Sequence, residues 1–312
     1  MKREFAKLHG LGNDFVFFDD MENTMNLHDD QVKSLCDRHF GIGADGVILV
    51  RPPKTPGAVA YMHYINSDGT LAQMCGNGVR CFAKYLVDYG YADASGSLIV
   101  DTMAGPKPIT YTTDANGLLA LATVDMGRPI LDPKLVPVNA PVDAVSDSGE
   151  GYVRNLAIAS PWGTFRFTCV SMGNPHAVCI LDDWENLSDE LFSNEREKNL
   201  ASLDLDRIGA YFETHPVFPE KTNVEFATTA SDGIHMRVFE RGCGETLACG
   251  TGACATSVAA ALSGWGGCES DVHLLGGALH VSWGENGHVL MTGPAQLAFT
   301  GSVEIEVGCA YV

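Results

Sequence analysis

The sequence predicts an α+β protein of two pseudo-symmetric halves, each a curved, mostly antiparallel sheet around a central helix. Three observations lead to this fold class. One segment pattern occurs twice, strand-like runs dominate the chain, and each half has one strongly apolar stretch of helical composition. With 312 residues, the chain is long enough for two domains of ordinary size.

The repeated segment centres on a Cys-Gly-x-Gly step, which occurs at Cys75 and again at Cys249. Each step follows a strand-like run and precedes a segment of helical composition. A polar residue closes each run nine positions before the cysteine, Asn66 in the first copy and Glu240 in the second. The shared spacing predicts that the two copies occupy equivalent places in the two halves.

Glycine and proline punctuate the pattern near residues 125–129 (DMGRP), where we expect the domain boundary. The predicted N-terminal half is residues 1–126, to which a C-terminal strand at 297–312 returns. The predicted C-terminal half is residues 127–296, with the active site in the cleft between the halves. The Pro-rich, acidic stretch 129–151 is expected to be a surface excursion.

Composition and charge exclude several classes of protein. The net charge of −19 and the lack of a basic stripe argue against a nucleic-acid partner. No segment reaches the roughly 18 apolar residues that a membrane span needs, and the charged N-terminus is not typical of a secretory signal. We therefore expect a cytoplasmic protein, in which the ten cysteines are reduced.

The two Cys-Gly-x-Gly steps can do chemistry if each runs into a helix. Glycines let the backbone approach a ligand, and the N–H groups at a helix start bind anions. The same end of the helix stabilises a thiolate, which predicts lowered pKa values for Cys75 and Cys249. One such element supplies both a carboxylate cradle and a reactive sulfur.

Two such elements facing one another would form an amino-acid racemase or epimerase. One thiolate removes the α-proton and the opposite thiol returns a proton from the other side, so that the centre inverts. The N–H groups stabilise the carbanion. The sequence shows no pyridoxal-lysine, dinucleotide or Walker pattern and no C-x-x-C pair, so we expect no cofactor and no metal site.

The other eight cysteines are more simply interpreted as core residues. They are Cys36, Cys81, Cys169, Cys179, Cys243, Cys254, Cys268 and Cys309. A thiol redox or metal-binding protein remains an alternative, since two facing thiols could oxidise.

Polar residues beside the motifs are candidates for the same site. His176 could tune a thiol, although most lone histidines are satisfied core or surface groups. An exposed pair such as Glu240 and Arg241 is usually solvated, but its position matches that of Asn66. Asn13, Asn174 and Asn223 each adjoin an apolar strand, where turn chemistry alone would explain them. Their recurrence in both halves favours substrate binding.

Six segments of the chain together resemble the diaminopimelate epimerase family. They are KLHGLGNDFVFFD, HFGIGADGV, NSDGTLAQMCGNGVRC, VSMGNPHAV, KTNVEF and VFERGCGETLACGTGACA. They run in the family's order from residue 6 to about residue 255. The resemblance implies interconversion of LL- and meso-diaminopimelate without metal or pyridoxal phosphate, in lysine and peptidoglycan-precursor synthesis, by a homodimer.

The resemblance also implies roles for individual residues. Cys75 and Cys249 match the catalytic cysteines, and His176 and Glu240 match positions that influence thiol protonation. The positions matching the reacting end of the substrate are Asn13, Gly76, Asn77, Gly250 and Thr251. Those matching the distal L-centre are Asn66, Asn174, Asn223, Glu240 and Arg241, where Arg241 suits a carboxylate and Glu240 an ammonium.

The chain departs from the family in three places. Gly46 stands where some members carry a glutamine that contacts substrate, and Phe299 stands where some have a tyrosine at the dimer contact. Segment 129–161 is longer than the family requires. The nearest rival is a proline or hydroxyproline racemase, which tends to have His after the first Cys-Gly and does not need Arg241. A phenazine-biosynthesis-like isomerase lacks the paired thiols.

Overall fold

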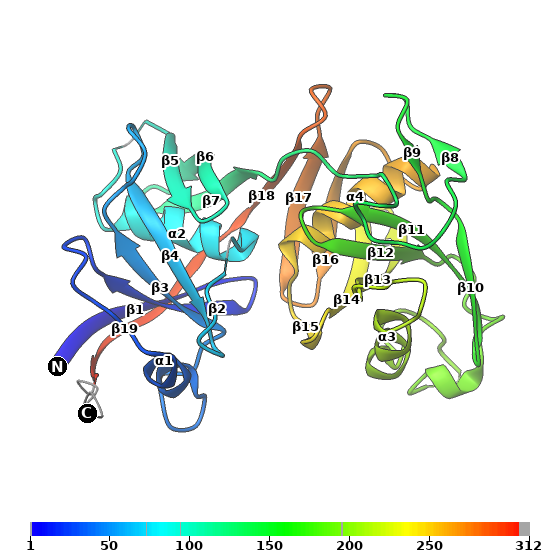
Figure 1. Ribbon diagram of the computed structural model, residues 1–312, viewed down its shortest axis with the longest axis horizontal. Helices are drawn as coiled ribbons and strands as arrows, with labels where there is room; N and C mark the ends of the chain where they lie inside the picture. The colour runs from blue at the N-terminus through cyan, green and yellow to red at the C-terminus, as the bar shows by residue number, and fades with distance from the viewer. Residues whose placement is uncertain (1, 73, 94, 195, 306–312) are drawn as a thin grey trace. The chain divides into compact units, whose positions relative to one another are not determined.

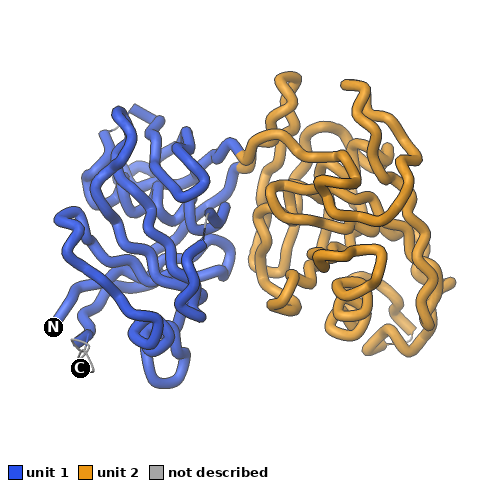
Figure 2. The backbone as a smooth tube through the Cα atoms, in the orientation of Figure 1, with its two compact units in different colours: residues 1–125, 292–312 blue, residues 126–291 orange. Residues whose placement is uncertain are grey.

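The structure is a computed structural model that describes residues 2–72, 74–93, 95–194 and 196–305. The chain divides into two compact units (Figure 2): unit 1 comprises residues 1–125 and 292–312, and unit 2 comprises residues 126–291. Residues 306–312 of the predicted return strand, and with them Cys309, lie outside the described residues. In the described part of the chain, no helix is both long and apolar enough to cross a membrane.

Unit 1 is a sheet that curves around one helix. Its elements, in chain order, are β1 (Lys2–Gly10), β2 (Asn13–Asp19), α1 (Asp29–Cys36), β3 (Gly46–Arg51), β4 (Ala60–Asn66), α2 (Gly76–Asp88), β5 (Ser97–Thr102), β6 (Gly105–Thr113), β7 (Leu119–Asp125) and β19 (Gln296–Glu304). The strands pair in the order β19-β1-β2-β3-β4-β5-β6-β7, and the β2–β3 and β4–β5 pairs are the parallel ones. Helix α2 packs against β1, β2 and β7 (Figure 1). Strands β1 and β2 lie near one edge of the sheet and β7 lies at the other edge. Since one helix contacts strands near both edges, the sheet must curve around it.

Unit 2 has the same plan. Its elements are β8 (Ala144–Val145), β9 (Gly151–Tyr152), β10 (Leu156–Ser160), β11 (Gly163–Ser171), β12 (Pro175–Ile180), η1 (Asp189–Leu191), α3 (Leu205–Glu213), β13 (Asn223–Ala230), β14 (Gly233–Glu240), β15 (Gly244–Thr246), α4 (Gly250–Ser263), β16 (Glu269–Leu274), β17 (Gly277–Trp283) and β18 (Val289–Pro294), in which the chain passes back to unit 1. The main sheet runs β10-β11-β12-β13-β14-β16-β17, with parallel pairs at β12–β13 and β14–β16. Helix α4 packs against strands β11 to β14, β16 and β17.

The two units repeat one order of strand pairings. Strands β1 to β6 pair antiparallel, parallel, antiparallel, parallel and antiparallel. Strands β11, β12, β13, β14, β16 and β17 pair in the same sequence of directions. The central helix follows the fourth of these strands in both units. The predicted fold class is confirmed, including the pseudo-symmetry and the mostly antiparallel sheets.

Strand β2 is buried on both faces. Phe17 stacks on Phe82 and Tyr85 of α2, with ring centroids 6.5 and 5.4 Å apart. Val16 and Phe18 belong to a separate cluster on the side of α1. Since neighbouring side chains of a strand point to opposite faces, a strand between two helices needs apolar residues at successive positions. This explains the apolar run FVFF in the sequence.

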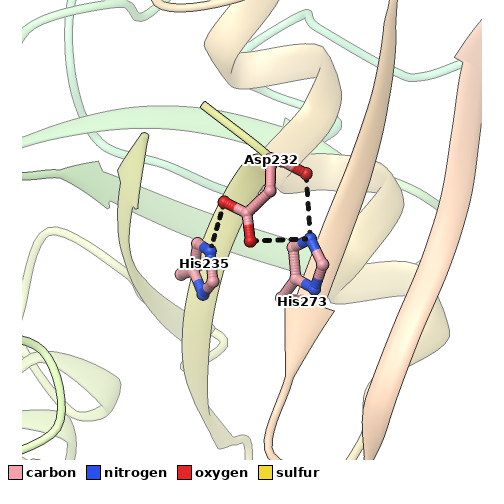
Figure 3. Close-up of side chains that lie close together, drawn as sticks. All are labelled: Asp232, His235 and His273. Carbon is pink, nitrogen blue, oxygen red and sulfur yellow. Dashed lines mark hydrogen bonds and ion pairs between the residues drawn. The ribbon is translucent and has the colours of Figure 1, made fainter. Parts of the chain in front are cut away.

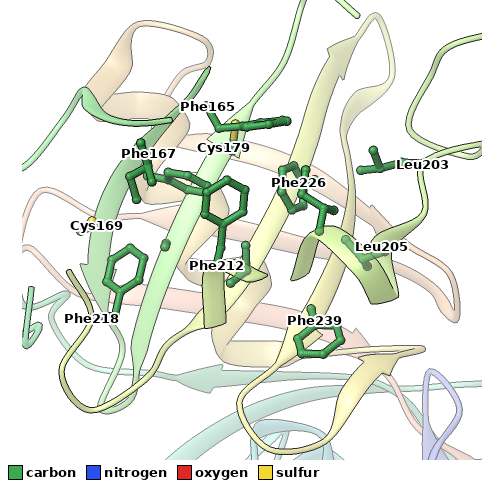
Figure 4. Packing of buried hydrophobic residues seen from close by; sticks show 14 of the residues in the cluster. Phe165, Phe167, Cys169, Cys179, Leu203, Leu205, Phe212, Phe218, Phe226 and Phe239 are labelled. Carbon is green, nitrogen blue, oxygen red and sulfur yellow. The ribbon is translucent and has the colours of Figure 1, made fainter. Parts of the chain in front are cut away.

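A phenylalanine cluster fills the core of unit 2 on the side of α3 (Figure 4). Phe212 of α3 lies 5.3 and 4.8 Å from Phe165 and Phe167, in edge-to-face pairs, and also contacts Phe226 of β13 at 6.3 Å. Such pairs add about 0.5–1.5 kcal/mol beyond the area they bury. With Phe226 fixed on this face, its neighbour Glu225 points to the opposite face of β13, toward α4.

Small residues make up most of α4. Its sequence is GTGACATSVAAALS, and ten of its residues are buried. Small side chains let the surrounding strands approach closely, which a close-packed interior requires. The helix ends at Gly264, whose φ of 76° is the left-handed conformation that glycine adopts readily.

The Pro-rich stretch 129–151 is not simply a surface excursion, and this prediction was wrong. Val136 and Val138 are 2% and 6% exposed and belong to the core of unit 2. The β8–β9 hairpin ends at Tyr152, which is buried and whose hydroxyl donates to the carbonyl of Leu262 at 3.1 Å. Val136 and Val138, which alternate with prolines, supply the apolar area for burial, whereas Leu135, Val142 and Val145 of the same stretch stay exposed.

Candidate active site

Cys75 is the residue that caps the N-terminus of α2. Its backbone is extended, with φ −137° and ψ 124°, and the helix begins at the next residue, as predicted. The half-buried thiol lies 3.5 Å from Oδ1 of Asn13. Cys75 therefore stands at the positive end of a helix, beside an amide from β2.

A chain of side-chain hydrogen bonds fixes the amides around Cys75. Asn77 Nδ2 donates to Asn13 Oδ1 at 3.2 Å, and Asn13 Nδ2 donates to Asp45 Oδ2 at 2.7 Å. Arg80 Nη2 donates to Asn77 Oδ1 at 2.8 Å, and the Arg80 side chain is fully buried. These bonds connect the buried guanidinium of Arg80, through Asn77, to the amide of Asn13 beside the thiol.

Ion pairs stabilise this series of hydrogen bonds at the end where Asn13 contacts Asp45. Arg38 bridges Asp14 and Asp45 at 2.9 and 2.7 Å, and Lys7 contacts Asp14 at 2.9 Å. Burial alone would raise the pKa of Asp14, but hydrogen bonds from Arg38 and Lys7 outweigh it and keep this pKa below its usual value. Arg38 thus ties the ionised Asp14 to Asp45, and Asp45 orients Asn13.

Asn66 ends β4, as the shared spacing predicts, and its amide donates to Thr70 Oγ1 at 3.0 Å within the following turn. Across the ladder it pairs with Gly46. A Cβ at Gly46 would lie 2.5 Å from Tyr64 Cε2 and 2.6 Å from the carbonyl oxygen of Ile65. Packing against β4 therefore leaves no room for a side chain where some family members have glutamine.

Cys249 repeats the place of Cys75 at the start of α4. Its Sγ accepts a hydrogen bond from the backbone N–H of Gly252 at 3.3 Å and lies 3.5 Å from Thr251 Oγ1. The residue is only 5% exposed. The predicted helix start is confirmed, and here the sulfur itself caps the helix.

The expected lowering of the thiol pKa is wrong for Cys249. Burial raises this pKa well above its usual value, and the charges of Glu240 and Glu225 raise it further. Hydrogen bonds from Thr251 and Gly252 act in the opposite direction but do not compensate. Desolvation of a thiolate thus exceeds the benefit of the helix end, and Cys249 is a protonated thiol in this state.

His176 and Glu225 form a buried pair between β12 and β13. His176 Nδ1 lies 2.6 Å from Glu225 Oε1, and both side chains are inaccessible to solvent. His176 Nε2 lies 3.2 Å from Asn174 Oδ1. Burial raises the pKa of Glu225, although His176 opposes the rise. Glu225 and Asn174 thus hold the imidazole of His176 by its two nitrogens.

Glu225 also lies against the start of α4. A Cβ on Gly252 would come within 2.9 Å of Glu225 Oε1 and 3.2 Å of Cys249 Sγ. The second glycine of this Cys-Gly-x-Gly step is therefore needed for the close approach of a carboxylate and a thiol. Glu225 Oε2 is buried and has no hydrogen-bond partner among the described residues.

Glu225 and Arg80 were not among the predicted site residues. Both have a signal in the sequence: Glu225 interrupts the apolar strand NVEFA, and Arg80 lies in a helix that is otherwise largely apolar. A charged residue at a core-facing position is rarely buried without a partner.

Asn223 is almost completely buried and organises the loops beside His176. Its Nδ2 donates to the carbonyl of Pro175 at 2.7 Å, and its Oδ1 accepts from the backbone N–H of Arg241 at 2.9 Å. The Arg241 side chain is exposed and donates to the carbonyl of Glu220 at 3.2 Å. Glu240 ends β14 and accepts from the Thr246 hydroxyl. Unit 2 therefore has five of its predicted polar residues at or beside the ends of β12, β13 and β14: Asn174, His176, Asn223, Glu240 and Arg241.

The remaining cysteines only partly match the prediction of core positions. The buried ones are Cys36, Cys81, Cys169, Cys179 and Cys254. Cys243 and Cys268 are exposed, because each lies in a turn outside the packed strands, which corrects the prediction for these two.

Comparison with known proteins decides the family. The model of the family described as diaminopimelate epimerase matches residues 5–131 and 168–298 of the chain. The chain belongs to the diaminopimelate epimerase family. The family that the motifs indicated is thus confirmed. The stretch between the two matched ranges includes most of the segment that is longer than the family requires.

Two relatives show how far the similarity to diaminopimelate epimerases extends. Diaminopimelate epimerase of Leptospira biflexa is 42% identical over 306 residues, which cover 98% of this chain and 100% of the relative. Diaminopimelate epimerase of Synechocystis is 44% identical over 309 residues, with the same coverage. The similarity spans both units.

Solved structures of other proteins share the fold. A probable proline racemase from Agrobacterium radiobacter has a TM-score of 0.67 at 15% identity and covers 97% of this chain and 93% of that chain. A phenazine biosynthesis protein of the PhzF family from Bacillus anthracis has a TM-score of 0.64 at 15% identity and covers 98% and 100%. At this identity the likeness concerns the fold alone.

Proposed function

We propose that this chain epimerises diaminopimelate between its LL and meso forms, with Cys75 and Cys249 as the two acid–base groups. The observation that carries the proposal is that each unit starts its central helix directly after a cysteine, in a chain of the diaminopimelate epimerase family. The product would supply lysine and peptidoglycan-precursor synthesis. The chemistry is proton transfer between sulfur and carbon and needs no cofactor.

In the proposed reaction, one thiolate removes the α-proton and the thiol of the other cysteine gives its proton to the opposite face of the same carbon. The electron pair left on Cα is delocalised into the substrate carboxylate. The first N–H groups of a helix have no partner within the helix, so those of Gly76-Asn77 and Gly250-Thr251 suit this carboxylate. Asn13 accepts a hydrogen bond from the side chain of Asn77 and so helps to hold the start of α2 in place.

The protonated state of Cys249 supports a division of roles. Cys249 carries its proton in this state, so it is the acid for the stereoisomer whose α-proton faces Cys75. Conversion of the other stereoisomer requires Cys249 as the thiolate base and Cys75 as the protonated acid.

The distal end of the substrate requires a carboxylate site and an ammonium site. Arg241 offers an exposed side chain, and its backbone N–H donates to Asn223; Glu240, the preceding residue, supplies a carboxylate at the end of β14. Asn66 and Asn174 are proposed to complete this recognition. A bidentate pair between a guanidinium and a carboxylate is strong and directional.

We further propose that Glu225 is a positioning residue that acts through His176. Glu225 Oε1 lies 2.6 Å from His176 Nδ1 and so fixes the orientation of the imidazole. Its charge also raises the pKa of Cys249, which keeps this thiol protonated. His176 and Glu240 would then set the protonation of the thiols.

A test of the substrate compares diaminopimelate with the substrates of the rival racemases. The purified chain is incubated in turn with LL-diaminopimelate, L-proline and trans-4-hydroxy-L-proline, and the stereoisomers are separated by chiral chromatography. We expect conversion of LL- to meso-diaminopimelate and none of the other two. Conversion of proline without conversion of diaminopimelate would show a proline-racemase-like enzyme instead.

We also propose a homodimer formed along β19, in the cytoplasm, where thiols stay reduced. β19 pairs with β1, and its Leu297 and Phe299 are 43% and 47% exposed. Phe299 packs edge-to-face on Phe5 at 5.9 Å, which presents an aromatic surface at this strand. Light scattering should give twice the chain mass of 33.4 kDa, and Leu297→Glu should give the monomer. A monomeric wild-type chain would refute the dimer.

A further inference from the structure

Three side chains, Asp232, His235 and His273, meet at the junction between β14 and β16 (Figure 3). Asp232 lies in the turn between β13 and β14, and His235 and His273 are directly paired neighbours in the β14–β16 ladder. His235 Nε2 lies 2.9 Å from Asp232 Oδ1. His273 Nε2 lies 3.0 Å from the Asp232 carbonyl oxygen and 3.9 Å from its Oδ2.

The three side chains lie nearly, but not fully, close enough to bind one metal ion together. The two imidazole rings stack with centroids 4.5 Å apart and an angle of 13° between their planes. One ligand atom from each of the three residues lies within 4.8 Å of the others. Tetrahedral ligands at zinc distances of about 2.0–2.2 Å are about 3.3 Å apart, so the atoms need to move by roughly 1 Å.

The backbone of this site is fixed, while the side chains can adjust. A Cβ on Gly233 would lie 2.2 Å from the carbonyl oxygen of Asp271, so the turn after Asp232 packs tightly against β16. The side chains of Asp232, His235 and His273 are 59%, 39% and 31% exposed. Exposed side chains can make a 1 Å adjustment by rotation, with no change in the fold.

We propose that Asp232, His235 and His273 bind one divalent transition-metal ion of the zinc class. Two imidazole nitrogens and one carboxylate oxygen favour Zn²⁺, Co²⁺ or Ni²⁺ over Mg²⁺ or Ca²⁺, which prefer oxygen ligands. Water would occupy the open coordination position. The ion would join the β13–β14 turn to β16, where the ladder pairs only two residues of β14 with β16 in the described structure.

This site lies apart from the proposed catalytic chemistry. From His235 to Glu240 along β14 is five residues, or about 17 Å at the rise of a strand. The cysteine spacing did not indicate the site, because its ligands are an aspartate in a turn and two histidines from different strands. A role in stabilising unit 2 follows from the position of the site.

The test counts bound ions on the reduced full-length chain. Equilibrium dialysis against Co²⁺ measures stoichiometry, and the absorption spectrum separates thiolate ligands, which give an intense near-ultraviolet charge-transfer band, from imidazole and carboxylate ligands. The wild-type chain should bind one more Co²⁺ than His235→Asn or His273→Asn, without an increase in the thiolate band. Asp232→Asn should weaken that site at least tenfold.

His280→Asn is the matched control. His280 is an exposed histidine of β17 that is paired with Asp271 and Glu269, but it has no second histidine in its group. This variant should bind as many ions as wild type. Circular dichroism establishes that each variant is folded.

Thermal unfolding provides a second measurement. Zn²⁺ at one hundred times its dissociation constant should raise Tm by roughly 5 °C or more in wild type, and His273→Asn should lose this shift. Equal Co²⁺ stoichiometry in wild type, His235→Asn and His273→Asn would overturn the proposal, as would binding seen only through the thiolate band. The histidines would then be ordinary ion-pair partners of Asp232.

Discussion

The N-termini of α2 and α4 share a motif, a fold position and a capping cysteine, but the side chains around the two sulfurs differ. Cys75 is half-buried beside the amide of Asn13, and the Arg80 guanidinium donates to the neighbouring Asn77. Cys249 is buried, with Glu225 and Glu240 close enough to raise its pKa. The comparison teaches that a Cys-Gly-x-Gly step fixes where a sulfur lies, whereas the neighbouring strands decide its charge.

The largest expected effect comes from removing either thiol. Cys75→Ala and Cys249→Ala should each lower kcat for epimerisation by at least about 10³-fold, because inversion requires a proton donor or acceptor on each face of the carbon. Chiral chromatography of diaminopimelate measures the loss. Cys254→Ala, which removes a buried cysteine of the same helix, is the control. Wild-type turnover in either single variant would exclude the two-thiol mechanism.

Glu225→Gln tests whether the acidic residues near Cys249 affect catalysis. The amide keeps the shape of the side chain but removes the carboxylate from His176. We expect kcat to fall about 10- to 100-fold, since a hydrogen bond to a charged group contributes about 1.5–3 kcal/mol, and the pH profile of kcat to shift.

Asp20→Asn is the matched control for Glu225→Gln. Asp20 is also a buried carboxylate with a nitrogen-bearing partner, Arg51 at 2.8 Å, but it belongs to unit 1. Both substitutions should lower thermal stability, and only Glu225→Gln should change the pH profile. Identical profiles for the two variants would mean that Glu225 is merely structural.

Thiol alkylation measures the difference between the two cysteines directly. In the substrate-free chain, iodoacetamide should modify Cys75 faster than Cys249, because Cys249 is buried and its pKa is raised. After burial, the charge of Glu240 is the largest cause of that rise. Glu240→Gln should therefore lower the pKa of Cys249, so that more thiolate is present and alkylation is about tenfold faster at a given pH. An unchanged rate would show that Glu240 does not act on this thiol.

The smallest expected effect compares equivalent glycines. A Cβ at Gly78 would meet atoms no closer than 3.5 Å, whereas one at Gly252 would meet Glu225 Oε1 at 2.9 Å. Gly78→Ala should raise the free energy of unfolding by about 0.5–1 kcal/mol, because alanine favours the helix. Gly252→Ala should lower it by about 1–3 kcal/mol through overpacking. Urea denaturation measures both changes in the free energy of unfolding. Equal changes in the two variants would show that the second glycine is no more tightly packed in one motif than in the other.

The fold class and the helix starts could be predicted because their signals are local. Asn66 and Glu240 end strands nine residues before a cysteine, and the structure has both strands end there. Strand β2 could be predicted from its apolar run, since burial on both faces leaves that pattern.

The electrostatics of the site could not be predicted in the same way. Glu225 reaches Cys249 only because β13 turns this residue toward α4, which depends on the packing of Phe226 on the other face. The raised pKa of Cys249 follows from burial by strands that are distant in sequence. Val136 and Val138 were placed at the surface for a similar reason, because composition does not show which core a segment completes.

Deuterium incorporation during the first turnovers tests the central claim most directly. LL-diaminopimelate is incubated in deuterated water, and both stereoisomers are analysed by mass spectrometry while conversion is still low. Two thiols on opposite faces predict meso product with one solvent deuterium at the inverted carbon and an LL pool that stays unlabelled. Deuterium that enters the LL pool as fast as meso product forms would show that one group exchanges the proton on a single face, which would contradict the account.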